Sequence, residues 1–238
     1  PTPTNPATKS LKVRQAVAYA VPYQKIIDAA LFGLAKPMFG AAANAATEVA
    51  WPQPTKFNTD ISKARALMAE AGFPNGFDTT LSFDLGFAVV NEPVCILIQE
   101  SLAQIGIRTT INKVPGANWR TELNKKEMPL FTNVFSGWLD YPEYFFFWCY
   151  DGSNSVFNTM SYQNPAMDKL IAAARASAAA GDATTYDASV RGFVDLAFAD
   201  VPRIPLFQPY SNVAMQKNVT GYQYWFHRRL NYSALAKA

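Results

Sequence analysis

The segment from Thr79 to Phe135 alternates between two hydrophobic patterns, and this alternation constrains the fold more than any other feature. Short runs rich in β-branched and apolar residues are separated by longer helical stretches. The predicted order is strand Thr79–Asp84, helix from Asn91-Glu92-Pro93 to Ile105, strand Ile107–Val114, helix Asn118–Lys126 and strand Leu130–Phe135. Strands joined by helical crossovers run parallel. The sequence therefore predicts an α/β fold with a largely parallel or mixed sheet flanked by helices.

Further helices are predicted on both sides of this segment. Leu11–Leu31 carries Ala and Val at helical spacing with Pro22 interrupting it. Asn58-Thr59-Asp60 supplies a helix start, and Gly72 a helix stop. The remaining predicted elements are helices at Asn164–Ala180 and Asp182–Ala199 and closing strands at Arg203–Phe207 and Asn212–Gln216. Half of the residues are apolar, which is enough for a hydrophobic core.

Composition and missing motifs argue against several classes of function. The formal net charge is +3, and basic residues cluster no further than pairs such as Lys125-Lys126, so nucleic-acid binding is not expected. No stretch approaches the roughly 18 apolar residues that a membrane span needs. One histidine, His227, and two cysteines are too few for a usual zinc site. Phosphate-binding glycine loops and the nucleophile elbow are absent. We expect no enzyme activity and no cofactor.

Cys95 and Cys149 lie in apolar surroundings, so buried thiols are expected, although the sequence leaves open whether they pair. The chain opens with a Pro-rich segment that has neither an initiator Met nor a secretory signal. This start suggests a mature product or an excised fragment.

The segment after the last predicted strand combines one acid with many aromatic residues. It runs from Phe135 through Trp138, Asp140 and Glu143 to Tyr150. Aromatic walls supply apolar contact, and a carboxylate among them fixes a cationic group by a charge-assisted hydrogen bond. Ligands of α/β folds bind at the carboxyl ends of strands, where this segment lies. A small-ligand cleft is therefore predicted. The alternative is an aromatic core in which Asp140 is a turn residue.

Several motifs, in order along nearly the whole chain, resemble the C-terminal half of the family 5 extracytoplasmic solute-binding proteins, the peptide- and nickel-type receptors of ABC importers. The matching segments are Lys12–Ala20, Phe57-Asn58, Ala64–Pro74, Gln99–Ile107, Gly137-Trp138, Asp140-Tyr141-Pro142, Asn158, Tyr162–Pro165, Asp168, Ala199–Pro202 and Ile204–Leu206.

The resemblance implies a fold of the type II periplasmic-binding-protein class, in which two lobes close on the ligand. Residues 1–216 are then expected to form the C-terminal ligand-binding lobe. Residues 217–238 are expected to return to an N-terminal lobe that this chain lacks. The implied partners are an oligopeptide-like ligand and the membrane permease subunits of an ABC importer, and the implied location is periplasmic or extracytoplasmic and lipid-anchored.

The resemblance also implies roles for individual residues. Asp140 is expected to bind the ligand's ammonium group and Trp138 to form an aromatic wall, while Ser136 and Gly137 offer backbone hydrogen bonds. The remaining predicted ligand-binding residues are Tyr141, Glu143 and Asp84.

Two departures from the family pattern bear on the ligand. The spacing between Trp138 and Asp140 is one residue shorter than usual, so Glu143 is a candidate substitute for Asp140. The region from Asp84 to Ala88 lacks the Arg with which dipeptide-binding members hold the ligand carboxylate. Longer peptides and cationic non-peptide solutes therefore stay open as ligands. Within the receptor class, the competing ligands are nickel chelates, heme, opines and oligosaccharides. Outside the receptor class, the alternatives are a hydrolase that uses Asp140 and Glu143, and a scaffold module.

Overall fold

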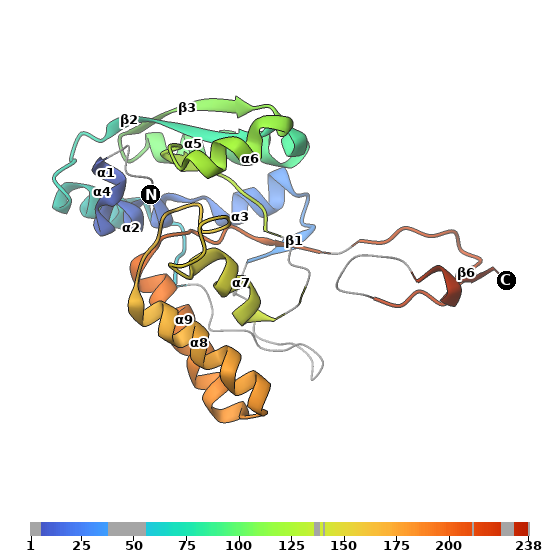
Figure 1. Ribbon diagram of the computed structural model, residues 1–238. Coiled ribbons are helices and arrows are strands. Elements are labelled where there is room, and N and C mark those ends of the chain that lie inside the picture. Colours follow the sequence, from blue (N-terminus) through green and yellow to red (C-terminus); the bar gives the residue numbers. More distant parts are fainter. Residues whose placement is uncertain are drawn as a thin grey trace.

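The computed structural model of the chain describes residues 6–37, 56–135, 139, 141–210, 212–224 and 231–237 (Figure 1). Its first half contains α1 (Pro6–Lys9), α2 (Leu11–Ala20), α3 (Tyr23–Lys25), the π-helical turn η1 (Ile26–Ala30), β1 (Ala35–Lys36), α4 (Ile61–Glu70), β2 (Phe77–Asp84), the 3-10 turn η2 (Leu85–Phe87), α5 (Ala88–Ala103) and β3 (Ile107–Val114). Its second half contains α6 (Gly116–Lys125), β4 (Leu130–Phe131), α7 (Pro142–Tyr150), α8 (Pro165–Ala180), α9 (Ala183–Asp200), β5 (Gln208–Pro209), β6 (Val219–Thr220), the 3-10 turn η3 (Tyr232–Ala234) and β7 (Ala236–Lys237).

The central sheet has the strand order β3-β2-β4, and both pairings are parallel. β2 pairs with β3 over its whole length, from Phe77 opposite Ile107 to Asp84 opposite Val114. Helix α5 makes the crossover between these two strands and packs against both. The predicted α/β class with strand–helix–strand crossovers is therefore confirmed. Two small antiparallel pairs, β1 with β5 and β6 with β7, add to the parallel sheet.

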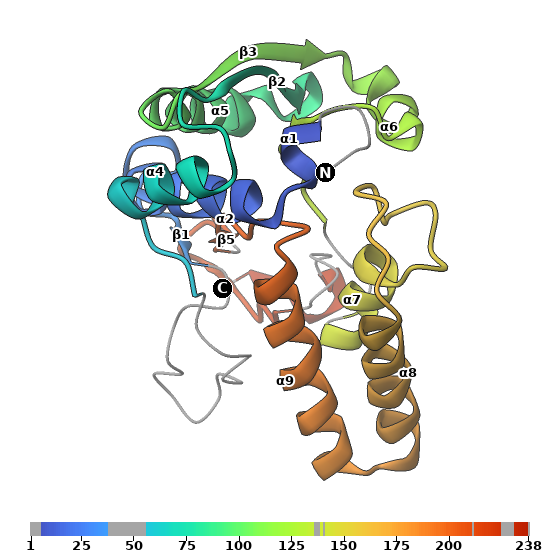
Figure 2. The same cartoon turned by 90° about the vertical axis from the view of Figure 1, so that its left-hand side faces the viewer.

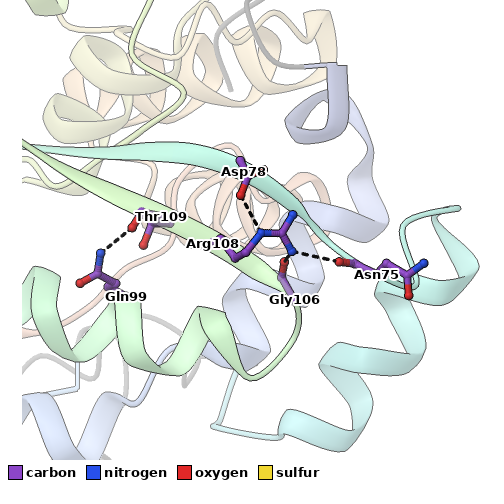
Figure 3. A network of polar contacts seen from close by, with 6 residues as sticks. All are labelled: Asn75, Asp78, Gln99, Gly106, Arg108 and Thr109. Atoms are coloured by element: carbon purple, nitrogen blue, oxygen red, sulfur yellow. Dashed lines mark hydrogen bonds and ion pairs between the residues drawn. The ribbon is translucent and has the colours of Figure 1, made fainter.

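A polar network fixes the amino-terminal edge of the β2–β3 pair (Figure 3). Arg108 on β3 donates from Nε to the Asp78 carboxylate on β2 at 2.6 Å, and from Nη1 to the carbonyls of Asn75 and Gly106. This hydrogen bond lowers the pKa of Asp78. Gln99 on α5 donates to the carbonyl of Thr109, so the crossover helix is tied to the same strand.

The other half of the molecule is helical. α8 and α9 lie side by side and extend away from the sheet, with α7 next to them (Figure 2). Phe146 on α7 stacks on Phe193 of α9 with ring centroids 4.1 Å apart, and both belong to the hydrophobic core that also contains the sheet residues Leu81 and Phe83. The buried residues of α9 include Val190, Phe193 and Val194.

Arg14 on α2 connects the start of the described chain to the end of α9. Its Nε and Nη2 donate to the carbonyl of Asp200 at 3.0 and 2.7 Å, and its Nη1 donates to the carbonyl of Lys9 at 2.7 Å. The Asp200 carboxylate accepts from Tyr162 and Asn164. Burial lowers the pKa of Arg14, although the neighbouring Asp200 charge opposes that shift.

Most predicted helix ends are confirmed, because they depend on local hydrogen bonds. Asp60, Asn164 and Asp182 each accept a backbone N–H in the first turn of the helix that follows. Pro22 separates α2 from α3 as expected, and Gly72 follows α4 with a φ of +85°.

Other local predictions were wrong. α5 begins at Ala88, so Asn91 and Pro93 lie inside it; Asn91 is buried and donates to the carbonyl of Asp84. The aromatic run Tyr144–Trp148, for which no helix was predicted, is part of helix α7. Strand β4 ends at Phe131 instead of Phe135. Arg203–Phe207 and the residues of Asn212–Gln216 are not in strands.

The prediction that no apolar stretch is long enough to span a membrane was also wrong. Within the described ranges, the segment Leu85–Ala103 is the one that meets the length and hydropathy of a membrane span. Its buried apolar residues, Val94, Cys95, Ile98 and Leu102, belong to the hydrophobic core. Packing against the sheet therefore accounts for its apolar character.

The described end of the chain leaves the body of the molecule. After β5 the chain extends outward, and β6 lies far from the sheet and the helices (Figure 1). β6 pairs with β7 through Val219 opposite Lys237 and Thr220 opposite Ala236. Most described residues from Asn212 onward are exposed. We call residues 212–237 the C-terminal arm, of which 212–224 and 231–237 are described.

Candidate functional site

The predicted site residues follow the carboxyl ends of two neighbouring strands. β2 ends at Asp84 and β4 ends at Phe131, and the two strands are paired directly. The segment after β4 leads to α7. Ser136, Gly137, Trp138 and Asp140 lie outside the described residues, so their ligand-binding roles stay predictions.

Asp84 has a local structural partner. Its carboxylate accepts from the backbone N–H of Gly86 at 2.7 Å and caps the turn η2. The side chain is buried, at 7% exposure. A Cβ on Gly116 would lie 3.3 Å from the same carboxylate, so this acid sits where the chain leaves β2 and where it enters α6. Its position agrees with the strand-end location that was predicted, while its role toward a ligand stays a prediction.

Tyr141 and Glu143 stand at the start of α7. Tyr141 immediately precedes the helix and is 57% exposed. The Glu143 carboxylate accepts from the Tyr186 hydroxyl on α9 at 2.6 Å. Burial, together with this hydrogen bond and the Glu143 charge, raises the pKa of Tyr186. Glu143 therefore ties the start of α7 to α9, a contact that the sequence did not indicate because the two residues are 43 positions apart.

An aromatic cluster joins the segment after β4 to α7. Its members are Phe135, Tyr144, Trp148 and Phe157. The Phe157 ring packs edge-on against Phe135 at 5.8 Å and against Trp148 at 5.3 Å between centroids. Phe135 and Phe157 are half-buried. The cluster thus joins the end of the strand segment, α7 and the loop after α7 into one apolar surface.

The loop 151–164, which carries Phe157, is held by side-chain hydrogen bonds. Asn158 donates to the carbonyls of Asp151 and Tyr162 and accepts from the Tyr162 N–H. Asn154 accepts from the backbone N–H of Phe157. Arg203 donates to the carbonyl of Phe157 at 2.8 Å. Asn158 therefore holds the loop through its side-chain hydrogen bonds.

Sequence reasoning missed Arg120 on α6. Its guanidinium lies over the Phe157 ring, 4.8 Å from the ring centroid. In Figure 2, α6 lies above the loop that follows α7. The neighbouring Trp119 is buried, stacks edge-on with Phe131 of β4 and donates to the Asn133 side chain. A single Arg in an amphipathic helix gives no signal of this position in the sequence.

Exposed apolar side chains occur in the segments that follow the two strand ends. They are Leu85 and Phe87 on η2, Val89 at the start of α5, and Val134, Leu139 and Tyr141 on the segment after β4. Phe87 is 59% exposed and Val89 is 92% exposed. Apolar side chains that gather around a polar site are typical of ligand or protein contact surfaces. Among the described residues, no three His, Cys, Asp or Glu side chains come close enough to hold a metal ion.

This chain is similar in sequence to several known proteins. The chain is 28% identical over 224 residues to the glutathione-binding protein GsiB of Escherichia coli (strain K12), covering 89% of this chain and 42% of the relative. It therefore spans less than half the length of such curated relatives.

Solved structures are similar as well. The DppA periplasmic binding protein of Helicobacter pylori, solved with the peptide STSA, has a TM-score of 0.78 at 23% identity, over 92% of this chain and 42% of that protein. The binding protein AgaA of A. tumefaciens R10, solved with agropinic acid, has a TM-score of 0.72 at 27% identity, over 91% of this chain and 44% of that protein.

These neighbours are periplasmic binding proteins, so the predicted fold class is confirmed. The model of the bacterial extracellular solute-binding proteins, family 5 middle region, matches residues 2–157, which is more than half of the chain. The chain belongs to the family 5 bacterial extracellular solute-binding proteins.

Proposed function

We propose that residues 1–216 form the C-terminal ligand-binding lobe of a receptor that delivers an oligopeptide-like solute to an ABC importer. Family membership and the similarity to the glutathione-binding protein GsiB support this assignment. Residues 217–238 would return to an N-terminal lobe, and the protein would act outside the cytoplasm. The permease subunits of the importer would be its membrane partner.

The observation that carries the proposal is the surface at the carboxyl ends of β2 and β4. Aromatic and apolar side chains follow these strand ends, and the family motif that contains Asp140 belongs to the same stretch of sequence. Such a surface buries the side chains of an extended ligand, while a carboxylate binds its ammonium group. A partly desolvated pair of this kind contributes roughly 1.5–3 kcal/mol.

The mechanism would be capture without chemistry. Ligand bridges the two lobes and favours the closed population, because only the closed form makes both sets of contacts. The importer then recognises the closed form. Neither lobe alone offers the whole binding surface, so we expect this chain by itself to bind more weakly than a two-lobed protein.

A thermal-shift screen tests the proposal on the full-length protein that contains this chain. Tripeptide pools with free and with acetylated N-termini are compared, alongside agropinic acid and sugars. We expect free peptides to raise the melting temperature and acetylated peptides to lose that effect. Asp140→Asn should abolish the difference, whereas Asp187→Asn, the same change at an exposed position on α9, should leave it intact. A shift with a non-peptide solute alone would contradict the peptide assignment.

A second candidate is a receptor for a small non-peptide acid. The 27% identity to AgaA, solved with agropinic acid, supports it. The same screen separates the two, because agropinic acid has its own arm. Turnover of any solute in the screen, measured by mass spectrometry of the mixture, would instead support the hydrolase alternative.

A further inference from the structure

We infer that Arg120 binds an anionic group of the ligand, in the first instance the carboxylate at the C-terminus of a short peptide. The inference rests on the proposed function and adds a residue that recognises the end of the ligand opposite to its ammonium group. The Asp84–Ala88 region has no basic residue that could bind a ligand carboxylate. Arg120 would provide that basic group from another element.

The first reason is the position of α6. The helix starts at Gly116, two residues after β3 ends, so it stands at the same sheet edge as the candidate site. Trp119 and Leu123 form its buried face and pack with Val114 and Met128 in a separate hydrophobic cluster. Arg120 is exposed, next to the buried Trp119. The anchored helix therefore places the Arg120 backbone firmly beside the loop 151–164.

The second reason is the orientation of the side chain. The guanidinium lies over Phe157, and Phe157 packs against Phe135 and Trp148 of the aromatic cluster. Stacking on an aromatic face holds the plane of the guanidinium and leaves its edge N–H groups available. An exposed ion pair is usually weakened by the conformational entropy that its long side chains lose. Stacking on Phe157 restricts the Arg120 side chain before ligand binds, so this loss is smaller.

The third reason is charge. Two acids of the described residues have other partners: Glu122 pairs with Lys125 at 2.8 Å, and Glu143 accepts from Tyr186. Within the part of the chain that the structure describes, Arg120 has no ion pair and no hydrogen bond. By contrast, Arg203 donates to the carbonyl of Phe157 and is thereby occupied. Arg120 thus offers a planar, always-charged fork that matches a carboxylate.

The structure also supplies a matched control. Arg175 on α8 lies over the Phe147 ring, 4.3 Å from the centroid, and is exposed like Arg120. It stands on the helical pair that extends away from the sheet edge. Arg175→Gln therefore removes the same charge and the same kind of stacking from a different helix, on a ring that is not itself one of the four members of the aromatic cluster.

The experiment measures melting-temperature shifts of the full-length protein with a tripeptide pool that has free C-terminal carboxylates and with the same pool as C-terminal amides. For the wild type, we expect half-maximal shift at a concentration about 10- to 100-fold lower with the free acids, as one charge-assisted hydrogen-bonded contact provides. Arg120→Gln should remove this preference without changing the response to amides. Arg120→Lys should retain part of it, and Arg175→Gln should retain all of it.

The outcomes distinguish a failure of the Arg120 assignment from a failure of the proposed receptor function. If the wild type binds acids and amides equally, or if Arg120→Gln and Arg175→Gln behave alike, the Arg120 assignment is overturned while the receptor function stands. If no pool shifts the wild type, the peptide-binding proposal and the Arg120 assignment both fall. A lowered melting temperature of unliganded Arg120→Gln would be visible in the same data, and Arg120→Lys then decides the assignment through its residual preference.

Discussion

At the scale of single residues, Glu143 illustrates what a sequence motif can and cannot tell. Its place after Tyr141-Pro142 marked it as a possible ligand carboxylate. In the structure it sits in the first turn of α7, where an acid complements the helix dipole, and it accepts from Tyr186 of α9. The partner is 43 residues away, so only the tertiary fold brings the two together. Arg120 was not predicted for the same reason, since its position at the candidate site depends on contact with Phe157, which is distant in the sequence.

The two cysteines lead to a prediction about reactivity. Cys95 and Cys149 are free and fully buried, as expected from their apolar neighbours. Burial raises the pKa of the Cys95 thiol to about 11, although a contact with Thr132 opposes the shift, and burial also raises the pKa of Cys149. The folded protein should therefore not react with Ellman's reagent at pH 8, and the unfolded protein should release two equivalents of product.

The raised pKa of Cys95 also determines how the free energy of unfolding changes with pH. Because the folded state holds the Cys95 proton more tightly, this thiol contributes stability below the unfolded thiol pKa of roughly 8.5, and the contribution is lost as pH rises toward 11. Urea unfolding at pH 8 and pH 10 should show a lower free energy of unfolding at the higher pH, with a smaller decrease in Cys95→Ala. Rapid labelling of the native protein at pH 8 would contradict the burial of these thiols.

At the scale of elements, the β2–β3 pair depends on two glycines that meet at its amino-terminal edge. Gly76 has a φ of +68°, and a Cβ there would lie 1.8 Å from the carbonyl oxygen of Gly106. Gly76→Ala therefore forces the strands apart as well as straining the backbone. We expect a loss of roughly 2–4 kcal/mol in the free energy of unfolding, measured by urea denaturation.

Gly33 provides the control for that substitution. Its φ is +73°, close to that of Gly76, but nothing lies within 4 Å of a Cβ placed on it. Gly33→Ala should cost only the backbone strain of about 1–2 kcal/mol. Equal losses in the two variants would mean that the close approach of Gly76 to Gly106 contributes nothing.

Elements with local signals were predictable, and those without were not. The helix caps at Asp60, Asn164 and Asp182 were found because a side chain bonds to the backbone a few residues away. The start of α5 was misplaced because the true start is set by Asp84 and η2 and not by the proline signal at Pro93. α7 was not predicted because its aromatic run has strand propensity, whereas in the structure the run forms a helix that packs on α8 and α9.

At the scale of the whole molecule, the body and the C-terminal arm differ in how they are held. The body has a continuous hydrophobic core, whereas the described residues of the arm are mostly exposed. Ending the chain after Gln216 should therefore change the melting temperature by less than about 2 °C. Differential scanning calorimetry of the shortened and the complete chain measures this directly.

A shorter truncation gives the contrasting case. Ending the chain after Asp200 removes Val201, which is 2% exposed, and also Arg203 with its hydrogen bond to the Phe157 carbonyl. Ile204, Leu206 and Phe207, which pack against the core, are lost as well. This version should unfold at a clearly lower temperature. If the version that ends at Gln216 were equally destabilised, residues 217–238 would be part of the body and the proposed boundary would be wrong.

The hydrogen bonds from Arg14 to the Asp200 carbonyl have a consequence for the order of folding. They close a loop of 186 residues, whereas the β2–β3 pairing joins residues about 30 apart. Long loops are costly to close before other contacts reward the closure, so the sheet and its crossover helix can form early and the Arg14 contact late. Loss of the Arg14 guanidinium would then accelerate unfolding and leave the refolding rate nearly unchanged. This contact would act as a latch on the finished molecule, governing how long the native state lasts.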